Sequence, residues 1–410
     1  MEPRSEKGRR FVIIHQPEIE SKNGRIRISA VVDLQNSQIN IPDVIWFEVP
    51  EDYQKFITNR ADGFAVALLL LAMALGENIE VRGVLSPRLA YGMQEYQRVF
   101  NCWFPQKFKL IDIKCNNYKS QHESDVLGGV ASAFSGGIDS FYTLWSHLPQ
   151  QQQDPNYRVG YGLFLHGYDI RLEDEATYYT AQQAYAEMMQ EQGLRLLVGR
   201  TNVYDFVGKL NWALSHGTAL VGFAMILGRL LSRFFIPSGY TYKDSNLRGG
   251  TDPVLDHLLS TETLEIIHDG ASATRVEKTA VVAKWPETYP LLRVCWMKPD
   301  GLRNCCECEK CLRTMTTLDM FGTLSKYLTF PQPFERQKIR SCRYIDEYDY
   351  IFAQEIIEYA TAVGRNDIAA DVRYALFRSR IKHRARQIKH QVAAPYKQLL
   401  KKTKTLVISR

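Results

Sequence analysis

The chain has 410 residues, of which 45% are hydrophobic and 23% are charged. This composition is typical of a globular protein of about two or three domains and argues against a disordered, collagen-like or solenoid chain. The strongly apolar stretch at 64–75 is too short to span a bilayer, and no apolar run of secretory-signal length follows the basic N-terminal residues. We therefore expect a cytoplasmic protein.

Charge is distributed unevenly along the chain. The segment from Arg373 to Arg410 contains six Arg and six Lys and no Asp or Glu, so it carries +12 while the rest of the chain carries −6. A basic tail on a mildly acidic body favours an anionic partner, either nucleic acid or a membrane surface. A solvated helix that contacts nothing is the alternative.

Residues 1–122 are predicted to form a mixed α/β domain. Strands are expected where β-branched residues dominate, and helices where the apolar pattern is longer. The expected strands are Phe11–His15, Arg25–Leu34, Val44–Val49, Ile79–Val84 and Phe108–Ile113, and the expected helices are Asp62–Leu75 and Tyr91–Phe100. The polar segment Lys114–Asp125 is expected to be a linker.

Residues 123–330 alternate between strands and helices, which is typical of a doubly wound parallel sheet with helices on both faces. The expected strands are Gly129–Phe134, Gly160–His166, Leu194–Val198, Arg233–Pro237 and Leu264–His268, with helices expected at Ser140–Leu148, Asp174–Gln192 and Thr218–Leu231. Residues 331–410 are predicted to be a helical C-terminal region, with helix from Tyr348 to Phe377 followed by the basic tail.

A glycine-containing loop is the most informative motif. Ser135–Ser140 reads Ser-Gly-Gly-Ile-Asp-Ser and joins an expected strand to an expected helix. Gly136 and Gly137 allow a tight turn, and the free N–H groups of the turn and of the helix start then favour an anion. The serine hydroxyls add donors, and Asp139 can hold a Mg²⁺ that bridges phosphates. In this context the motif predicts a phosphate site rather than an ordinary turn and helix cap.

Five of the eight cysteines lie between Cys295 and Cys311. Clustered cysteines in a large chain without a secretory signal favour a metal site over disulfides. Cys305, Cys308 and Cys311 can form a knuckle, and Cys295, at the end of a strand-like segment (Leu291–Cys295), can complete a tetrahedron. Four thiolates suit a closed, structural zinc site, and an iron–sulfur cluster is the alternative.

Together the two motifs resemble the N-type ATP pyrophosphatases, and among them the cyano-deazaguanine synthases, over about 126–320. The resemblance rests on Ser135–Ser140, on the helix start Thr274-Arg275-Val276-Glu277, and on Cys295 with the knuckle Cys305–Cys311. Arg275 stands where that family has Lys, and Cys306 stands where it has Gly. The N-terminal region and the basic tail have no counterpart in the small synthases.

The resemblance implies an adenine nucleotide alpha hydrolase-like fold and cleavage of ATP between its α- and β-phosphates. A substrate oxygen would attack the α-phosphate, pyrophosphate would leave into the loop, and a nitrogen or sulfur nucleophile would attack the adenylated substrate. The implied ATP-binding residues are Ser135, Gly136, Gly137, Ile138, Asp139, Ser140, Leu165 and His166. The implied catalytic residues are Asp139, Ser140, Arg275 and Lys278.

Further candidates follow from their position at the ends of strands. Ligands of open α/β sheets bind beyond the carboxyl ends of the strands. On this basis the candidate substrate contacts are Asp169, Tyr240, Tyr242, Asp244, His268 and Asp269. Trp212 and His216, at the start of the helical segment before the fourth strand, can line the same crevice. For each of them taken singly, an ordinary hydrogen-bonded structural role is the alternative.

These features favour a ligase-like enzyme that uses ATP, Mg²⁺ and Zn²⁺. The enzyme would activate a carboxylate or carbonyl oxygen for attack by a nitrogen nucleophile. This oxygen would belong to a small molecule or to a macromolecule. The first alternative is a sulfur-transfer enzyme acting on RNA, in which Cys306 or a metal-bound sulfide delivers sulfur. The second is an ATP-binding scaffold without activity that engages a partner through its N-terminal region. Since no glutaminase signature is evident, free ammonia or an amine is the simpler nitrogen donor.

Overall fold

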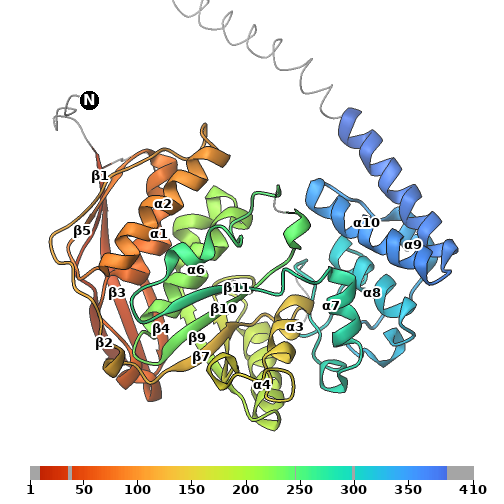
Figure 1. Ribbon diagram of the computed structural model, residues 1–410, viewed down its shortest axis with the longest axis horizontal. Coiled ribbons are helices and arrows are strands. Elements are labelled where there is room, and N and C mark those ends of the chain that lie inside the picture. The colour runs from red at the N-terminus through yellow and green to blue at the C-terminus, as the bar shows by residue number, and fades with distance from the viewer. Residues whose placement is uncertain (1–9, 36–38, 245, 298–300, 386–410) are drawn as a thin grey trace, which may run out of the picture.

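The computed structural model describes residues 10–35, 39–244, 246–297 and 301–385. Within these residues eleven strands form one continuous sheet in the order β11-β10-β7-β8-β9-β4-β3-β1-β5-β6, with β2 beside β3 (Figure 1). The strands are β1 (Phe11–Ile14), β2 (Glu18–Lys22), β3 (Arg25–Leu34), β4 (Val44–Pro50), β5 (Asn78–Val81), β6 (Ile113–Cys115), β7 (Gly129–Ala133), β8 (Tyr161–His166), β9 (Arg195–Thr201), β10 (Leu231–Pro237) and β11 (Glu265–Asp269).

The strands β7 to β11 are parallel to one another. Strand order proceeds from β7 through β8 to β9 on one side, whereas β10 and β11 lie on the other side of β7. This reversal between β7 and β10 is the switch point at which open α/β sheets bind ligands. The predicted α/β class is confirmed, but the sheet as a whole is mixed rather than parallel, because β4 and β3 enter it antiparallel.

The N-terminal strands extend the same sheet. β4 pairs with β9, with Phe47 opposite Thr201. The Thr201 hydroxyl donates to the carbonyl of Trp46 at 2.7 Å, and the Asn202 amide bonds to the backbone of Val44 and Trp46 at 2.9 Å each. The domain boundary at residue 122 stays a prediction. Strands from both sides of this residue belong to the same sheet.

Helices cover both faces of the sheet (Figure 1). They are α1 (Asp62–Leu75), α2 (Pro87–Trp103), α3 (Ile138–Ser146), α4 (Glu175–Glu191), α5 (Val203–Val207), α6 (Trp212–Ile226), α7 (Arg275–Val282), α8 (Glu309–Met320), α9 (Arg336–Ser341) and α10 (Glu347–Ala362), followed by a helix over 366–385. Alternate residues of β7 point to opposite faces of the sheet and so join the cores beneath the two layers of helices. Ala131 and Ala133 join the core beneath α1, α2 and α6, whereas Val130 and the following Phe134 join the core beneath α3 and α4.

Glycines allow α1 and α6 to approach closely. A Cβ on Gly222 would lie 2.6 Å from the carbonyl oxygen of Gly63, and a Cβ on Gly63 would overlap the carbonyl oxygen of Gly222. Both helices are almost entirely apolar and buried, so the contact lies within the main core. The N-terminal region and the β7–β11 region therefore share both a sheet and a core.

Three sequence expectations about single elements were wrong, and one strand was missed. Leu291–Cys295 is not a strand, since its backbone bonds to a side chain and to a loop rather than to a neighbouring strand. The helix expected at Thr218–Leu231 begins six residues earlier, at Trp212, and ends at Ile226. At 108–113 only Ile113 is in a strand, and β6 runs from there into the expected linker. The short polar strand β2 was not expected at all.

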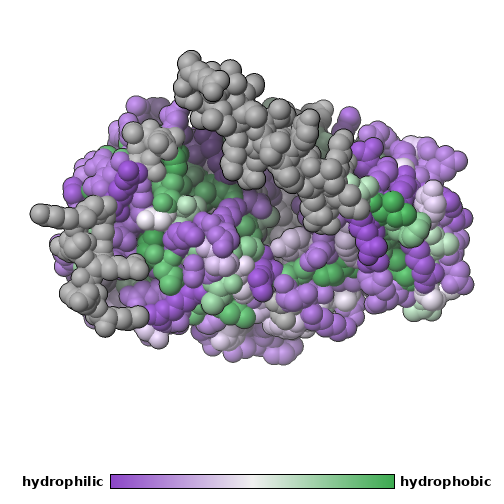
Figure 2. Space-filling view, turned by 90° about the horizontal axis from the view of Figure 1, so that it is seen from above, coloured by the Kyte–Doolittle hydropathy of each residue, from purple (hydrophilic) through white to green (hydrophobic). Residues whose placement is uncertain are grey.

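On the face seen in Figure 2, hydrophilic residues cover much of the visible surface, and hydrophobic residues gather in separate groups between them. Among the described helices, none has the length and apolar character needed to cross a lipid bilayer. The predicted basic tail is described as far as residue 385, and 386–410 lie outside the described residues.

Candidate active site and cysteine centre

The loop after β7 folds back on itself through its serines. The Ser140 hydroxyl donates to the Gly137 carbonyl at 3.0 Å and accepts the N–H of Ser135 at 3.3 Å. Gly136 has φ +75°, and a Cβ there would overlap the hydroxyl of the buried Tyr185. Only glycine fits this position, because the backbone is left-handed and the space is already filled. The loop therefore presents its backbone to the sheet edge.

A cavity of about 200 Å³ opens in front of this loop and the first turn of α3. It lies at the switch point, since residues that follow β7 and β8 line it together with the last two residues of β10. The cavity is lined by Ala133, Phe134, Ser135, Gly137, Asp139, Ser140, Leu163, Phe164, Leu165, Tyr168, Asp169, Ile170, Trp212, His216, Leu220, Ile236, Pro237 and Arg293. It thus brings together eight of the predicted site residues, which are Ser135, Gly137, Asp139, Ser140, Leu165, Asp169, Trp212 and His216.

Two cations from α7 meet the loop at Asp139. The Arg275 guanidinium lies 2.8 Å from one carboxylate oxygen, and the ammonium of Lys278 lies 3.8 Å from the other. Lys278 is 1% exposed and donates to the Ser238 carbonyl at 2.6 Å. Burial lowers the pKa of Lys278, and the Asp139 carboxylate opposes this shift. The predicted catalytic residues therefore form one charged group at the loop.

The C-terminal region holds α7 in place. Thr274 caps α7 in a reciprocal box with Glu277, and the backbone N–H of Arg275 donates to Glu355 of α10 at 2.9 Å. Burial raises the pKa of Glu355 to about 7. Phe352, also on α10, lies 5.3 Å from the Arg275 guanidinium. Sequence reasoning missed both α10 residues, since nothing in the sequence links residues 352–355 to 275.

His216 faces the cavity as a neutral ring. Burial lowers the pKa of His216. Its Nδ1 lies 3.1 Å from the Trp212 carbonyl, which can only accept, so Nδ1 carries the proton and Nε2 is left as an acceptor. Trp212 and Tyr168 stack edge to face at 5.5 Å beside it. This end of the cavity is therefore aromatic, whereas the loop end is polar.

Three other predicted residues are engaged in buried structural contacts and do not line the cavity. His166 is fully buried, stacks on Tyr178 at 4.2 Å and bonds to the Arg171 carbonyl at 2.7 Å. The two other residues, His268 and Asp269, lie at the end of β11. His268 bonds to Asp256 at 2.7 Å. Asp269 accepts a hydrogen bond from Thr143 at 2.7 Å and lies 3.0 Å from His147. Burial alone would raise the pKa of Asp269, but the hydrogen bonds from His147 and Thr143 lower it.

The segment after β10 also lies outside the cavity lining. Tyr240 stacks on Phe352 of α10 at 5.1 Å, and burial raises its pKa well above the usual range. Tyr242 is 58% exposed, and Asp244 accepts from the Thr241 hydroxyl at 2.7 Å. Ile138 and Gly136 belong to the loop without lining the cavity. Of the three predicted residues after β10, Tyr240 therefore packs against the C-terminal helix α10.

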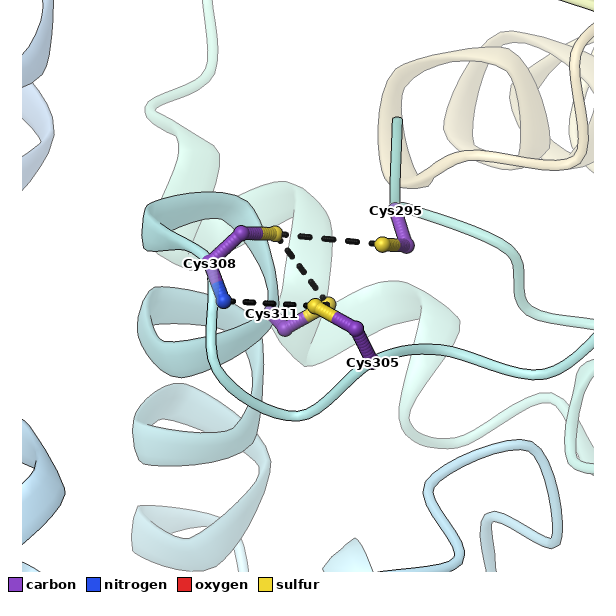
Figure 3. A group of neighbouring side chains, drawn as sticks. All are labelled: Cys295, Cys305, Cys308 and Cys311. Atoms are coloured by element: carbon purple, nitrogen blue, oxygen red, sulfur yellow. Dashed lines mark hydrogen bonds between the residues drawn. The ribbon is translucent and has the colours of Figure 1, made fainter. Parts of the chain in front are cut away.

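Four cysteines converge at the start of α8 (Figure 3). The sulfurs of Cys295, Cys305, Cys308 and Cys311 all lie within 4.8 Å of one another, and the nearest pair, Cys308 and Cys311, is 3.4 Å apart. The backbone N–H groups of Glu307 and Cys308 both donate to the Cys305 sulfur, as is usual around a thiolate. This cluster can hold a metal ion, and four thiolates suit zinc.

Cys306 lies inside the knuckle but apart from this cluster. Its φ is +57°, which explains why glycine suits this position. The side chain is fully buried in the core beneath α3 and α8, and its thiol lies 3.5 Å from the Asn304 carbonyl.

Arg293 and Asn304 connect the cysteine centre to the phosphate loop, and sequence reasoning missed both. The Arg293 N–H donates to the Gly136 carbonyl at 2.8 Å. Two residues later, the N–H of Cys295 donates to the Asn304 side chain at 3.0 Å. Neither residue belongs to a recognisable motif; the only signal was their closeness in sequence to the cysteines.

Comparisons of the chain with protein-family models, with curated proteins and with solved structures gave no match. We therefore infer the function from the loop, the cavity and the cysteine cluster.

Proposed function

We propose that this protein is an enzyme of the N-type ATP pyrophosphatase kind, which adenylates a carboxylate or carbonyl oxygen and passes it to a nitrogen nucleophile. One observation carries the proposal: the Ser135–Ser140 loop and the N-terminus of α3 face a cavity at the switch point of the sheet, with two cations at Asp139. Backbone donors, a helix N-terminus and cations at one place suit a polyphosphate.

The two ends of the cavity suit the two ends of ATP. Tyr168, Trp212 and His216 would pack against the adenine, and the unprotonated Nε2 of His216 can accept from its exocyclic amine. The loop would hold the phosphates. Arg275 and Lys278 would then stabilise the charge that builds up on pyrophosphate as the bond to the α-phosphate breaks.

Asp139 fits a role in holding Mg²⁺. Its Oδ1 is buried and has no hydrogen-bond partner within the described residues. Carboxylate oxygen is the ligand that Mg²⁺ prefers, and when bound with ATP the ion would neutralise phosphate charge. Arg275 pairs with the other oxygen, Oδ2, and the Lys278 ammonium lies 3.8 Å from Oδ1, beyond hydrogen-bond distance, so Oδ1 keeps its lone pairs for a metal ion.

The cysteine centre supports a structural role. Its four sulfurs leave no open position for a substrate on a tetrahedral zinc, and Cys295 and Cys311 are buried. Zinc there would fix the segment that reaches the phosphate loop through Arg293. Cys306, one of the two sulfur sources that the sulfur-transfer alternative allows, is fully buried. This burial favours nitrogen transfer over sulfur transfer.

The test is to measure ATP binding and then pyrophosphate release in the presence of ammonium and a panel of carboxylates. We expect AMP and pyrophosphate in equal amounts, with release dependent on the acceptor. ATP binding without release for any acceptor would favour the scaffold alternative, and absence of ATP binding would overturn the proposal. Retention of the protein on RNA or on anionic vesicles would test the predicted partners of the basic tail.

A further inference from the structure

Lys278, Arg293 and Arg313 are the buried lysine and arginine residues of the described chain. Lys278 forms an ion pair with Asp139 and donates to the Ser238 carbonyl. Arg313 forms an ion pair with Glu309 at 3.3 Å and lies 3.9 Å from the centre of the Phe352 ring. Arg293 is 8% exposed, yet within the described residues its guanidinium has neither an ion pair nor a hydrogen bond, and its Nε is buried without a partner. It is the exception among the three.

The position of Arg293 is fixed from both sides. Its own N–H donates to the Gly136 carbonyl at 2.8 Å. The Asn304 side chain accepts from the N–H of Val294 at 2.9 Å and donates to the Leu292 carbonyl at 2.8 Å, so the residues on either side of Arg293 are fixed too. Arg293 also lines the cavity, together with Ser135, Gly137 and Asp139. Its side chain is thus held beside the loop.

A buried guanidinium without a counter-charge is costly, because it has lost its hydration and gained no partner. Such a group is normally satisfied by an anion, and guanidinium matches phosphate oxygens with paired N–H groups. We propose that Arg293 is an anion-binding residue of this cavity and contacts a phosphate group of ATP and of the leaving pyrophosphate. The assignment rests on the proposed function and extends it to a residue outside the recognised motifs.

Calorimetric titration with Mg-ATP and with inorganic pyrophosphate tests this assignment. We expect Arg293→Gln to weaken binding of both ligands at least tenfold and Arg293→Lys to weaken it less, because lysine keeps the charge and loses the paired donors. The matched control is Arg303→Gln, an exposed arginine ten residues away that does not line the cavity. It should bind both ligands as the wild type does.

Thermal unfolding distinguishes ligand binding from a structural role. Without ligand, Arg293→Gln should unfold at the wild-type temperature or above, since it removes an unpaired buried charge. The stabilisation by saturating pyrophosphate should shrink in the same variant. The assignment would be overturned if Arg293→Gln unfolded at a lower temperature than the wild type without ligand and if folded Arg293→Lys bound both ligands with wild-type affinity.

The two proposals fail in different ways. If the wild type binds ATP and pyrophosphate and Arg293→Gln binds them within twofold, the assignment of Arg293 is wrong and the proposed function stands. If the wild type binds neither ligand, the proposed function is wrong and the assignment of Arg293 falls with it.

Discussion

Asp139 lies 2.8 Å from the guanidinium of Arg275, although the two residues are separated by most of the β7–β11 region. The carboxylate at the start of α3 and the cation at the start of α7 therefore neutralise each other across the mouth of the phosphate loop. Lys278, at 3.8 Å, adds a second positive charge to the same carboxylate. This group carries two positive charges and one negative, so it favours an incoming anion.

Asp139→Asn should reduce pyrophosphate release at least about a hundredfold, about 2.7 kcal/mol in barrier. The amide keeps the shape of the side chain but has no negative charge, so it binds a divalent cation more weakly and does not balance the two cations. We expect a moderate loss of stability as well, because Lys278 is buried and loses its counter-charge. A steady-state assay with Asp125→Asn, an exposed aspartate, as control checks the prediction. Release at the wild-type rate would contradict it.

Gly136→Ala should abolish ATP binding and destabilise the protein. The new Cβ would overlap the Tyr185 hydroxyl, and alanine is strained at φ +75°. Gly128→Ala separates these two effects, since Gly128 has φ +83° but nothing within 4 Å of its Cβ position. Calorimetry and thermal unfolding of both variants measure the result. Equal ligand affinity in the two variants would show that the loop tolerates the side chain.

Cys308→Ser should lower the metal content and the unfolding temperature, with activity falling as a consequence. Removing one of four thiolates opens the site, and metal affinity contributes directly to local folding. Elemental analysis should detect zinc in the wild type, whereas a brown protein with iron would identify a cluster instead. Cys102→Ser, an exposed cysteine outside the centre, is the control. An unchanged metal content in Cys308→Ser would refute the ligand assignment.

Cys306→Ala should keep at least about half of the pyrophosphate-release rate, a barrier change within about 0.4 kcal/mol. The thiol is buried in the core and its neighbours can bind the metal without it. Cys342→Ala, which also removes a buried thiol, controls for the loss of packing. A loss of about a hundredfold confined to Cys306→Ala, with metal still bound, would favour sulfur transfer.

Glu355 makes stability depend on pH. Burial raises its pKa from 4.5 to about 7 in the folded protein, so between these values the folded state holds a proton that the unfolded state has released. The free energy of unfolding should therefore fall as the pH rises from about 4.5 to about 7, by no more than about 3 kcal/mol, and this contribution should level off above that.

Glu355→Gln should remove this dependence, because glutamine does not titrate and its carbonyl can still accept from the Arg275 N–H. Urea unfolding at several pH values compares the variant with the wild type. Glu358→Gln, an exposed residue of the same helix, should keep the wild-type slope. Parallel curves for Glu355→Gln and the wild type would contradict the assignment.

Local signals in the sequence predicted local structure well. The helix α1 has the predicted bounds, because its apolar run ends at Gly76, which adopts the left-handed cap conformation. β7 and the loop after it were predicted because an apolar strand runs directly into two glycines. The four cysteines converge as their spacing indicated. In each case a few neighbouring residues contain the whole signal.

Long-range partners could not be read in the same way. His268 and Asp269 were predicted from their position at a strand end, but their contacts with Asp256 and His147 depend on packing between distant segments. Leu291–Cys295 has the composition of a strand, yet the Asn304 side chain takes its backbone bonds. Arg293 belongs to no motif, and only burial and the cavity reveal it.

The pairing of β4 with β9 has a consequence for synthesis of the chain. The Thr201 hydroxyl bonds to Trp46, which is 155 positions earlier, so β4 leaves the ribosome long before its partner exists. Until residues 195–201 emerge, one edge of β4 is unpaired, and an unpaired edge can capture other strands. The N-terminal half of the chain therefore has an exposed strand edge during synthesis until β9 pairs with β4.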